Sequence, residues 1–545
     1  MHSALNPTAT MDCVGPEIQE RRRTSDSDSE LDLKRDVPVD VVHVVDLDNE
    51  CKASPVYPCS AVKDDDTPQA WLSKITQVLA GWGVETNGIN PIPPEQRTDK
   101  RLYQFFFLWF SANANILTMA AGTIGPAFYG LGIRDACLVI VVMNLVTSVF
   151  PAYFAVFGPK LGARSMVQAR FSWGYYGGII PSVLNICSNQ GYLILNTIIG
   201  GQTLGSISSH LNATLGIVII GLITLGVVFS GYRVLHWYET YVWIPNVIAF
   251  VVMIAVSGKH VVDAPLSGTT PVTASTIMTF GSTLAATIVS WATITADYGV
   301  YHDHTASTAR IFVYTYLGFV VSSMPSQLLG ASFAATAVYV PSWKAGMGNG
   351  NSIGGLIAAI LEPAGGFGKF LLVLLSLTAP SQCAPAMYTV CTSFMTISRV
   401  LQRLPRFAVA ILSTIVLIPV AIVGSSRFYA TFADILSFIG YWLAPFCAIV
   451  LVEHFVYRRG RWSAYDVLDA WDKPAHPNLP RGYAAVFTFV VAVGFIVLCM
   501  EQEWWTGPIA AAGTGDVGML LGFLLSIPVH ILARWVERRW IEGRV

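Results

Sequence analysis

Apolar segments of membrane-spanning length recur from Phe105 to the end of the chain, and they restrict the fold more than any other feature. Each runs for about 20 residues, the length of helix that crosses the hydrocarbon core of a bilayer. Of the 545 residues, 53% are hydrophobic and only 12% are charged, whereas soluble domains carry about 25% charged residues. Spanning segments must satisfy their own backbone hydrogen bonds, which favours helices. We therefore expect an all-α integral membrane protein.

The hydropathy pattern predicts twelve transmembrane helices within a transmembrane domain of residues 104–540. A short apolar segment at 352–361 is interpreted as a re-entrant or interfacial piece before the eighth span. The twelve predicted spans are 104–123, 135–157, 177–202, 212–230, 240–256, 279–300, 311–336, 366–396, 407–424, 434–455, 482–500 and 517–536.

The segment before the first span differs in composition from the rest. Residues 1–70 contain acidic runs such as SDSDSE and lack helical periodicity, which predicts a disordered acidic cytosolic tail. It has no apolar stretch of the kind found in a cleavable signal peptide. Residues 71–103 are interpreted as a cytosolic lead-in to the transmembrane domain.

Lysine and arginine residues are concentrated in the links that follow even-numbered spans. Arg399, Arg458 and Arg459 lie in such links, and the C-terminal RWVERRWIEGR is also basic. Because positive charge favours the cytosolic side, both termini are predicted to be cytosolic. The sequon NAT at Asn212 is then the only one in an outer link, but its closeness to the next span argues against glycosylation.

Four of the predicted spans carry an unusual number of polar side chains. Prolines and glycines in the same spans free backbone groups, which membrane proteins tolerate only where those groups face protein or a wet cavity. Spans one and six, and spans three and eight, stand five apart, as expected for two five-helix inverted repeats with broken helices 1 and 6. Polar contacts that only hold helices together are the alternative. The polar positions include Ser111, Asn113, Asn115 and Thr118, then Asn185, Asn189, Tyr192 and Asn196, then Trp291, Thr293 and Asp297, and finally Ser381 and Gln382.

The residue types in these spans indicate what such a site would bind. Aromatic rings offer stacking surfaces to flat ligands, and amides offer donors and acceptors that match the edge of a heterocycle. Tyr192 and Asn196 stand four residues apart and therefore share one helix face. The spans contain no cluster of Lys or Arg that would neutralise a phosphate or carboxylate. A neutral, planar, hydrogen-bonding solute fits this pattern best.

Several long stretches resemble the fungal purine–cytosine permeases of the nucleobase–cation symporter-1 family. They are GVETNGINPIPPEQRTDKRLYQFFFLWFSANANILT, RFSWGYYGGIIPSVLN with the GY, N and GGQ that follow, and WLAPFCAIVLVEHFVYRR. The resemblance covers about residues 71–540. It implies a LeuT-like fold of twelve helices with a five-plus-five inverted repeat. It also implies cation-coupled uptake of nucleobases or related compounds across the plasma membrane, with H⁺ as the coupling ion in fungi.

The resemblance assigns roles to six positions of this sequence. Tyr192 and Trp291 match the aromatic pair that sandwiches the base, although the third-span residue is usually Trp. The amide one turn later matches Asn196, and Thr118 matches a substrate-proximal Ser. In the eighth span the usual NxxPN is replaced by QCAPA, so that Gln382 still offers an amide while Ala386 offers none. These departures put cytosine and adenine in doubt as substrates.

Other ionisable residues suggest fewer roles. Asp297, near the end of the sixth span, is a candidate proton acceptor or helix-packing partner. His302 and His304 offer too few ligands for a metal site, and the nine cysteines lack metal-binding spacing. We therefore expect no metal and no cofactor beyond the coupling ion. The expected partners are the lipid bilayer and a small neutral heterocycle, without nucleic acid and without an obligate protein partner.

Three functions remain open on the sequence. The first is a secondary active transporter for a purine, cytosine or a related nucleobase-like ring. The second is a transporter of a vitamin-like ring such as pyridoxine, or of a pathway-specific metabolite. The third is a non-transporting nutrient sensor with the same fold. An enzyme is not expected, because the chain has no cluster of His, Asp and Glu, no nucleophile elbow and no phosphate loop.

Overall fold

The computed structural model describes residues 88–543 except 209, 230–240, 269–270, 349 and 405. The chain divides into two compact units, residues 1–65 and 66–545, and all described residues belong to the second. The predicted tail at 1–70 lies outside the described residues, as does the lead-in up to residue 87.

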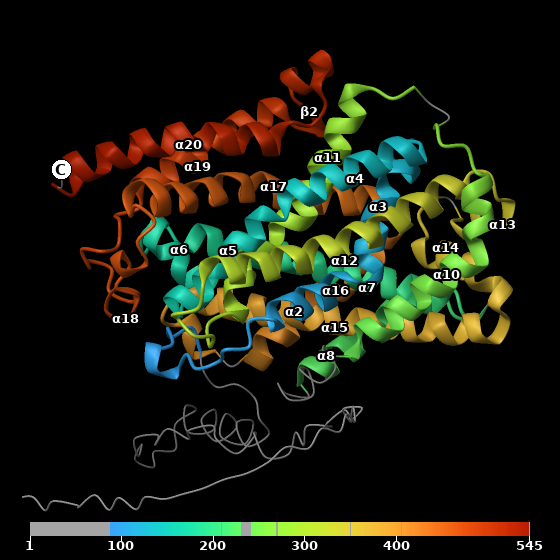
Figure 1. The fold of residues 1–545 in the computed structure, drawn as a ribbon, viewed down its shortest axis with the longest axis horizontal. Coiled ribbons are helices and arrows are strands. Elements are labelled where there is room, and N and C mark those ends of the chain that lie inside the picture. Colours follow the sequence, from blue (N-terminus) through green and yellow to red (C-terminus); the bar gives the residue numbers. More distant parts are fainter. Residues whose placement is uncertain are drawn as a thin grey trace, which may run out of the picture. The chain divides into compact units, whose positions relative to one another are not determined.

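Helices make up most of the described part of the chain, as expected, and they lie side by side as a bundle (Figure 1). Strands β1 (Glu501–Gln502) and β2 (Trp505–Thr506) form a small antiparallel hairpin. The α-helices are α2 (Gln104–Asn113), α3 (Ile116–Ala127), α4 (Ile133–Thr147), α5 (Val149–Leu161), α6 (Ser165–Trp173), α7 (Ile179–Gly205), α8 (Ala213–Phe229), α10 (Trp243–Asp263), α11 (Ala274–Val289), α12 (Thr308–Ala337), α13 (Pro341–Gly346), α14 (Ile353–Leu361), α15 (Gly365–Ile397), α16 (Arg406–Ser425), α17 (Phe428–Val452), α18 (Val467–Ala470), α19 (Tyr483–Cys499) and α20 (Gly518–Val536). Shorter 3-10 or π-helical turns are η2 (Pro94–Gln96), η3 (Ser290–Thr293), η4 (Thr295–Tyr298), η5 (Glu362–Ala364), η6 (Leu401–Arg403), η7 (Glu453–Tyr457), η8 (Trp462–Ala464), η9 (Ala510–Thr514) and η10 (Glu537–Ile541).

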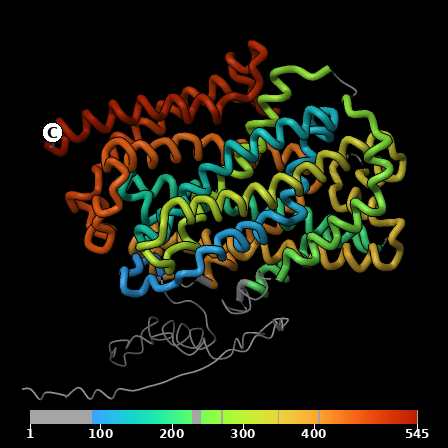
Figure 2. Tube along the Cα trace, viewed as in Figure 1, coloured from blue at the N-terminus to red at the C-terminus, as the bar shows by residue number. Residues whose placement is uncertain are grey.

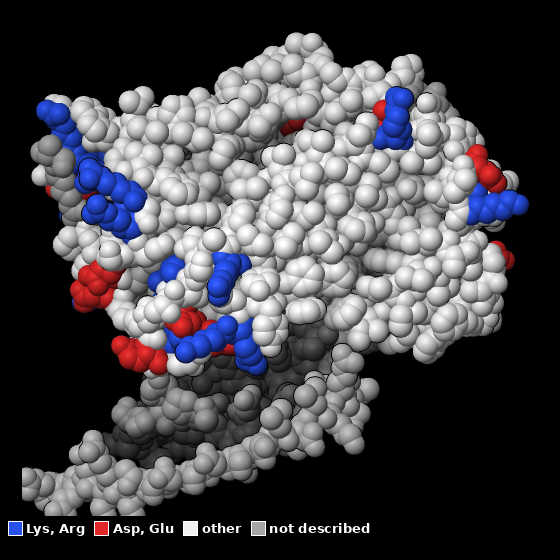
Figure 3. Space-filling view, viewed as in Figure 1, with Lys and Arg blue, Asp and Glu red and all other residues white. Residues whose placement is uncertain are grey.

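Seven helical segments within the described residues are long and apolar enough to cross a membrane, or eight if α2 and α3 count as one bent span. Helix α7 is 27 residues long but is not among them. Its buried amides Asn185, Asn189 and Asn196 lower its hydropathy. Figure 3 shows a broad uncharged belt across the visible face, with the Lys, Arg, Asp and Glu side chains near its margins. This distribution suits a protein that crosses a bilayer several times.

The first predicted span is made of two helices, α2 and α3, which are bent by 54° relative to each other. Between them Asn115 adopts an extended backbone with φ −144° and ψ 170°, and its side chain accepts a hydrogen bond from the amide of Thr118. That side chain supplies the N-cap of α3, because a free helix N-terminus needs an acceptor for its orphan amides. The chain is thus able to end one helix and begin another at membrane depth.

The sixth predicted span also loses α-helical geometry partway along. Helix α11 ends at Val289, although the predicted span runs to residue 300, and the 3-10 turns η3 and η4 follow. Ser290 donates its hydroxyl to the carbonyl of Thr287, and Thr293 donates to the carbonyl of Ser290. Hydroxyl groups that bond to nearby carbonyls compete with regular helix geometry, which accounts for the 3-10 turns here.

Close contact between α3 and α12 depends on glycine. A Cβ atom at Gly122 would lie 1.9 Å from the carbonyl oxygen of Gln327, and one at Gly330 would lie 1.9 Å from the carbonyl oxygen of Met119. Small residues let membrane helices approach to backbone contact. Helix α15 packs along α7 in the same bundle (Figure 2). Helix α3 also contacts α7 and α11, which brings the interrupted first and sixth spans beside α7.

Candidate binding site

A cavity of about 40 Å³ lies where the interrupted helices meet α7 and α15. Its lining includes all six residues to which the sequence assigned a substrate role, and their chain positions run from Thr118 to Ala386. The structure therefore brings these six together, while substrate binding by them stays a prediction. The cavity is lined by Asn113, Asn115, Leu117, Thr118, Asn189, Tyr192, Asn196, Thr287, Ser290, Trp291, Ile294, Gln382 and Ala386.

Helix α7 presents three polar side chains to this cavity, Asn189, Tyr192 and Asn196. Their spacing of three and then four residues places them along one helix face. The hydroxyl of Tyr192 is 2.8 Å from the hydroxyl of Ser290, so the tyrosine ring is tied to the first residue after α11. Asn196 donates its Nδ2 to the carbonyl of Tyr192 at 3.0 Å. The hydroxyl of Tyr192 and one of the two N–H groups of Asn196 are thus engaged within the protein.

Trp291 lies in the turn η3, and it is half-buried. Its ring centre is 5.5 Å from that of Trp109 in an edge-to-face arrangement, and 6.1 Å from that of Phe319. Such aromatic contacts favour a fixed ring orientation. The residue is therefore held by helices α2 and α12 while it also lines the cavity.

The start of α3 and the middle of α15 supply the remaining walls. Asn113 donates to the carbonyl of Trp109 at 3.0 Å, and Asn115 donates to the carbonyl of Ala112 at 2.6 Å. On α15, Gln382 is half-buried and Ala386 is 7% exposed. Helix α15 continues past two internal prolines, which leaves backbone carbonyls without their usual helical donors.

The cavity is uncharged. No Asp, Glu, Lys, Arg or His occurs among the described residues that line it. A buried charge without a partner is costly, so this lining disfavours a carboxylate, a phosphate or a permanently charged cation. It suits a neutral ligand with a flat ring and a polar edge.

Seven lining residues were not among the predicted site residues, and five of them are polar, namely Asn113, Asn115, Asn189, Thr287 and Ser290. Three of these had been recognised as polar interruptions in spans one and three. Their polar character was the available signal, but it did not show which of the many polar residues would face the same cavity.

Asp297 lies in the turn η4 and is not part of the cavity lining. It is 8% exposed, and its Oδ1 accepts a hydrogen bond of 2.6 Å from the amide of Ser165, the first residue of α6. A carboxylate at a helix N-terminus satisfies an orphan amide and the helix dipole. This contact accounts for a packing role, and its part in proton coupling stays a prediction.

The two histidines that follow Asp297 lie apart from the cavity as well. His302 is buried beside Phe105, with ring centres 4.5 Å apart, while His304 is exposed. Burial lowers the pKa of the His302 imidazole, which favours its neutral form. Asn212 is exposed at the start of α8, where its Oδ1 accepts a hydrogen bond from the amide of Leu215 at 2.7 Å.

One surface group within the described residues brings together side chains that could hold a metal, namely Asp466, Asp469 and His476. Asp469 already accepts hydrogen bonds from Lys473 and from His476, the latter at 3.0 Å. The two aspartates are exposed. Ion pairs with Lys473 and His476 already use the Asp469 carboxylate. None of the three residues lines the central cavity, so the group suggests no function there.

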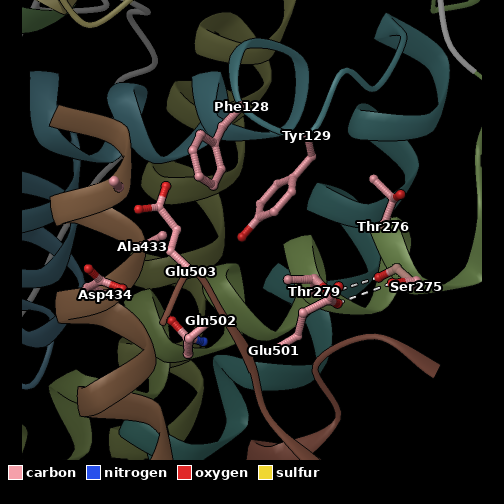
Figure 4. A pocket seen from close by; sticks show the side chains of 11 residues that line it. Phe128, Tyr129, Ser275, Thr276, Thr279, Ala433, Asp434, Glu501, Gln502 and Glu503 are labelled. Carbon is pink, nitrogen blue, oxygen red and sulfur yellow. Dashed lines mark hydrogen bonds between the residues drawn. The ribbon is translucent and has the colours of Figure 1, made fainter. Parts of the chain in front are cut away.

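A larger cavity of about 180 Å³ lies at one end of the bundle (Figure 4). It is bounded by the end of α3, the first turns of α11 and α17, and the hairpin between α19 and α20. The rings of Phe128 and Tyr129 lie along one side in Figure 4, and Glu501 lies on the other side, beside Thr279 and Ser275. Glu501 accepts hydrogen bonds from Thr279 at 2.9 Å and from Ser275. Helix α11 thus lines both cavities, and α3, which lines the smaller one, ends beside the larger one.

The model of a family of permeases for cytosine/purines, uracil, thiamine and allantoin matches residues 91–522. Relatives include purine-cytosine permease fcyB of Emericella nidulans, which is 37% identical over 85% of this chain and 91% of its own length. Purine-cytosine permease FCY2 of Saccharomyces cerevisiae is 33% identical over 91% of this chain and 95% of its own length. Vitamin B6 transporter TPN1 of the same yeast is 27% identical over 86% of this chain and 90% of its own length.

Among solved structures, the chain is similar to Mhp1, a nucleobase-cation-symport-1 family transporter, in a closed conformation with bromovinylhydantoin bound. The TM-score is 0.64 at 18% identity, and the match covers 84% of this chain and 96% of the other. At this identity the likeness concerns the fold, and it extends over nearly the whole helical bundle described above.

Proposed function

Because this chain belongs to the family of permeases for cytosine/purines, uracil, thiamine and allantoin, as a purine–cytosine permease of the nucleobase–cation symporter-1 type, we propose that it carries a planar, neutral nitrogen heterocycle into the cell by proton-coupled symport. It is a multi-pass membrane transporter and not an enzyme. The proposed substrate is a purine, a cytosine-like base or a related ring, and the proposed location is the plasma membrane.

The observation that carries this proposal is the uncharged cavity, with Tyr192 and Trp291 as rings and Asn196 and Gln382 as amides. Flat heterocycles gain from stacking on aromatic faces, and their edges pair with amide groups. Secondary transporters place such sites near the middle of the bilayer, next to interrupted helices. Helices α2–α3 and α11 are interrupted at the cavity in this way.

For the architecture we propose twelve spans, a five-plus-five inverted repeat and cytosolic termini. Under this orientation the 180 Å³ cavity faces outward and forms an entrance along α3 and α11. Tags at residues 1 and 545 are then expected to be protected from external protease in intact cells. Digestion of either tag in intact cells would contradict the twelve-span topology.

A vitamin-like ring such as pyridoxine is the second candidate substrate, favoured by two observations. One is the 27% identity to a vitamin B6 transporter over 86% of this chain. The other is Ala386 in the cavity wall, where the resemblance to purine–cytosine permeases leads us to expect an amide. A ring that makes no hydrogen bond to an amide at this position would lose no affinity by its absence.

Uptake in a yeast strain that lacks its own base and pyridoxine transporters tests the proposal. We expect accumulation of at least one ring from a panel of labelled purines, pyrimidines and pyridoxine. We also expect faster uptake at acidic external pH, because a proton gradient would drive symport. Asn196→Ala should abolish uptake at normal surface abundance, since it removes an amide of the cavity wall. Binding without accumulation for every ring would indicate a sensor and contradict the transport proposal.

A further inference from the structure

We propose that Asn189 is a specificity-determining residue whose side-chain oxygen accepts a hydrogen bond from an N–H group of the ligand ring. The inference rests on the proposed function, because it concerns the ligand of the same cavity. It goes further by naming the chemical feature that the ligand must carry: a hydrogen-bond donor on the edge that faces α7.

The position of Asn189 places it in the cavity wall. It stands one turn before Tyr192 and two turns before Asn196, so that the three share one face of α7. All three line the cavity, and Asn189 is only 2% exposed. It is therefore a buried amide beside the space in which a ligand would lie.

One end of the Asn189 amide is engaged and the other is free. Its Nδ2 donates to the carbonyl of Asn185 at 2.8 Å and to Oδ1 of Asn185 at 3.1 Å. Its Oδ1 is buried and has no hydrogen-bond partner among the described residues. Most buried polar atoms in folded proteins are paired, so an unpaired acceptor on a residue that lines a cavity calls for a reason.

The hydrogen-bond chain behind Asn189 fixes which end of the amide is free. Asn185 donates its Nδ2 to the hydroxyl of Ser393 on α15 at 2.9 Å, which leaves Oδ1 of Asn185 as an acceptor. A flipped Asn189 would bring its own oxygen against two acceptors of Asn185, an arrangement without any donor. The network from α15 through Asn185 thus holds the nitrogen of Asn189 inward and leaves its oxygen as the available group.

The neighbouring groups strengthen the preference for a donor. Asn196 also engages its Nδ2 within α7, and the hydroxyl of Tyr192 is engaged with Ser290. Of the three polar residues that α7 presents to the cavity, only Asn196 keeps a donor, its second N–H, that is unused among the described residues, whereas Asn189 supplies an acceptor without a partner there. A ring N–H would pair with that acceptor, and a methyl group in the same place would bury it without a partner. A loss of this kind weakens binding by about ten- to a hundred-fold.

The test compares rings that differ only in the donor. Purified full-length protein is mixed with adenine, cytosine, hypoxanthine or pyridoxine, and with each of the three bases methylated at each ring N–H in turn. Apparent affinity is taken from the concentration dependence of the ligand-induced rise in melting temperature. For the wild type we expect at least one ring to bind, and to bind about ten- to a hundred-fold more tightly than one of its methylated forms.

Two variants and a control connect this preference with Asn189. Asn189→Ala should reduce the preference for the N–H ring over its methylated form to below about threefold. The variant should bind the N–H ring more weakly than the wild type does, but bind the methylated ring equally well. Asn189→Ser serves if the alanine variant does not fold, since a serine at this place can donate back to the helix, as Ser188 does to Leu184 at 2.9 Å. The control is Asn246→Ala on α10. Asn246 is another buried amide whose Oδ1 and Nδ2 have no partner among the described residues, but it lies outside the cavity lining.

The control variant Asn246→Ala should keep the full preference of the wild type for the N–H ring over its methylated form. If a folded Asn189 variant binds the N–H ring as tightly as the wild type and with the same preference, the inference is overturned while the proposed function stands. If no ring stabilises the wild type, the proposed function is overturned and the inference falls with it. Loss of preference in the Asn246 variant as well would show a general packing effect and would also overturn the assignment to Asn189.

Discussion

Replacement of Trp291 by alanine offers the sharpest check on the aromatic wall of the cavity. The indole ring lines the cavity, and it also contacts Trp109 and Phe319 with ring centres 5.5 and 6.1 Å apart. Its removal deletes a stacking surface for the ligand, and such contacts contribute about 0.5–1.5 kcal/mol beyond the burial of area. At about 1.4 kcal/mol per factor of ten, the KM for uptake should rise about two- to thirteen-fold from stacking alone.

The assay measures the uptake KM of an accumulated ring together with the amount of transporter at the cell surface. Trp291→Phe keeps an aromatic face and should stay closer to the wild type than Trp291→Ala. Phe319→Leu is the matched control, because Phe319 contacts both Trp109 and Trp291 but does not line the cavity. It should lower the folded amount more than it changes KM.

Two results would refute this reasoning. One is an unchanged KM in Trp291→Ala at normal surface abundance, which would mean that the ring only packs within the protein. The other is an equal rise of KM in Phe319→Leu, which would mean that general loosening of the aromatic cluster, rather than a lost ligand contact, explains the effect.

Three further predictions concern other parts of the structure. The natural protein should take up cytosine and adenine weakly or not at all, and Ala386→Asn should increase this uptake. Adding Tyr192→Trp should increase it further, but not additively, because both positions line one cavity. Micromolar cytosine uptake by the unmodified chain would contradict this prediction. Asp297→Asn keeps a side-chain oxygen that can accept the hydrogen bond from the first amide of α6. If Asp297 only caps that helix, uptake at a fixed pH should persist in this variant. Loss of the pH dependence of uptake would instead reveal a coupling role. Gly122→Ala should sharply reduce the folded transporter measured by detergent gel filtration, because its Cβ would lie 1.9 Å from the Gln327 carbonyl and overpacking of this kind costs about 1–3 kcal/mol or more.

The sequence predicted the class of fold because the bilayer leaves few choices. Runs of about 20 apolar residues must become helices when no water is present to bond their backbone. Helices indeed occur at each of the predicted spans, as with α12 at Thr308–Ala337 for the predicted 311–336. The limits of helices were less predictable, since α11 begins at Ala274 and ends at Val289 whereas 279–300 was expected.

Part of the site was also within reach of the sequence. The spacing of Tyr192 and Asn196 gave their common face directly, because helix periodicity is a local property. Resemblance to a known family added Thr118, Trp291, Gln382 and Ala386, which no local pattern would have joined. All of these line one cavity in the folded chain.

Only the tertiary structure decided which polar atoms are free, because hydrogen-bond partners come from segments far apart in the chain. The hydroxyl of Tyr192 is taken by Ser290, and a carboxylate oxygen of Asp297 is taken by the backbone of α6. The oxygen of Asn189, by contrast, has no partner within the described part of the chain, because a network that begins on α15 turns the nitrogen of this amide inward. A sequence shows that an amide is present, but the directions of its donor and acceptor depend on neighbours that only folding brings into contact.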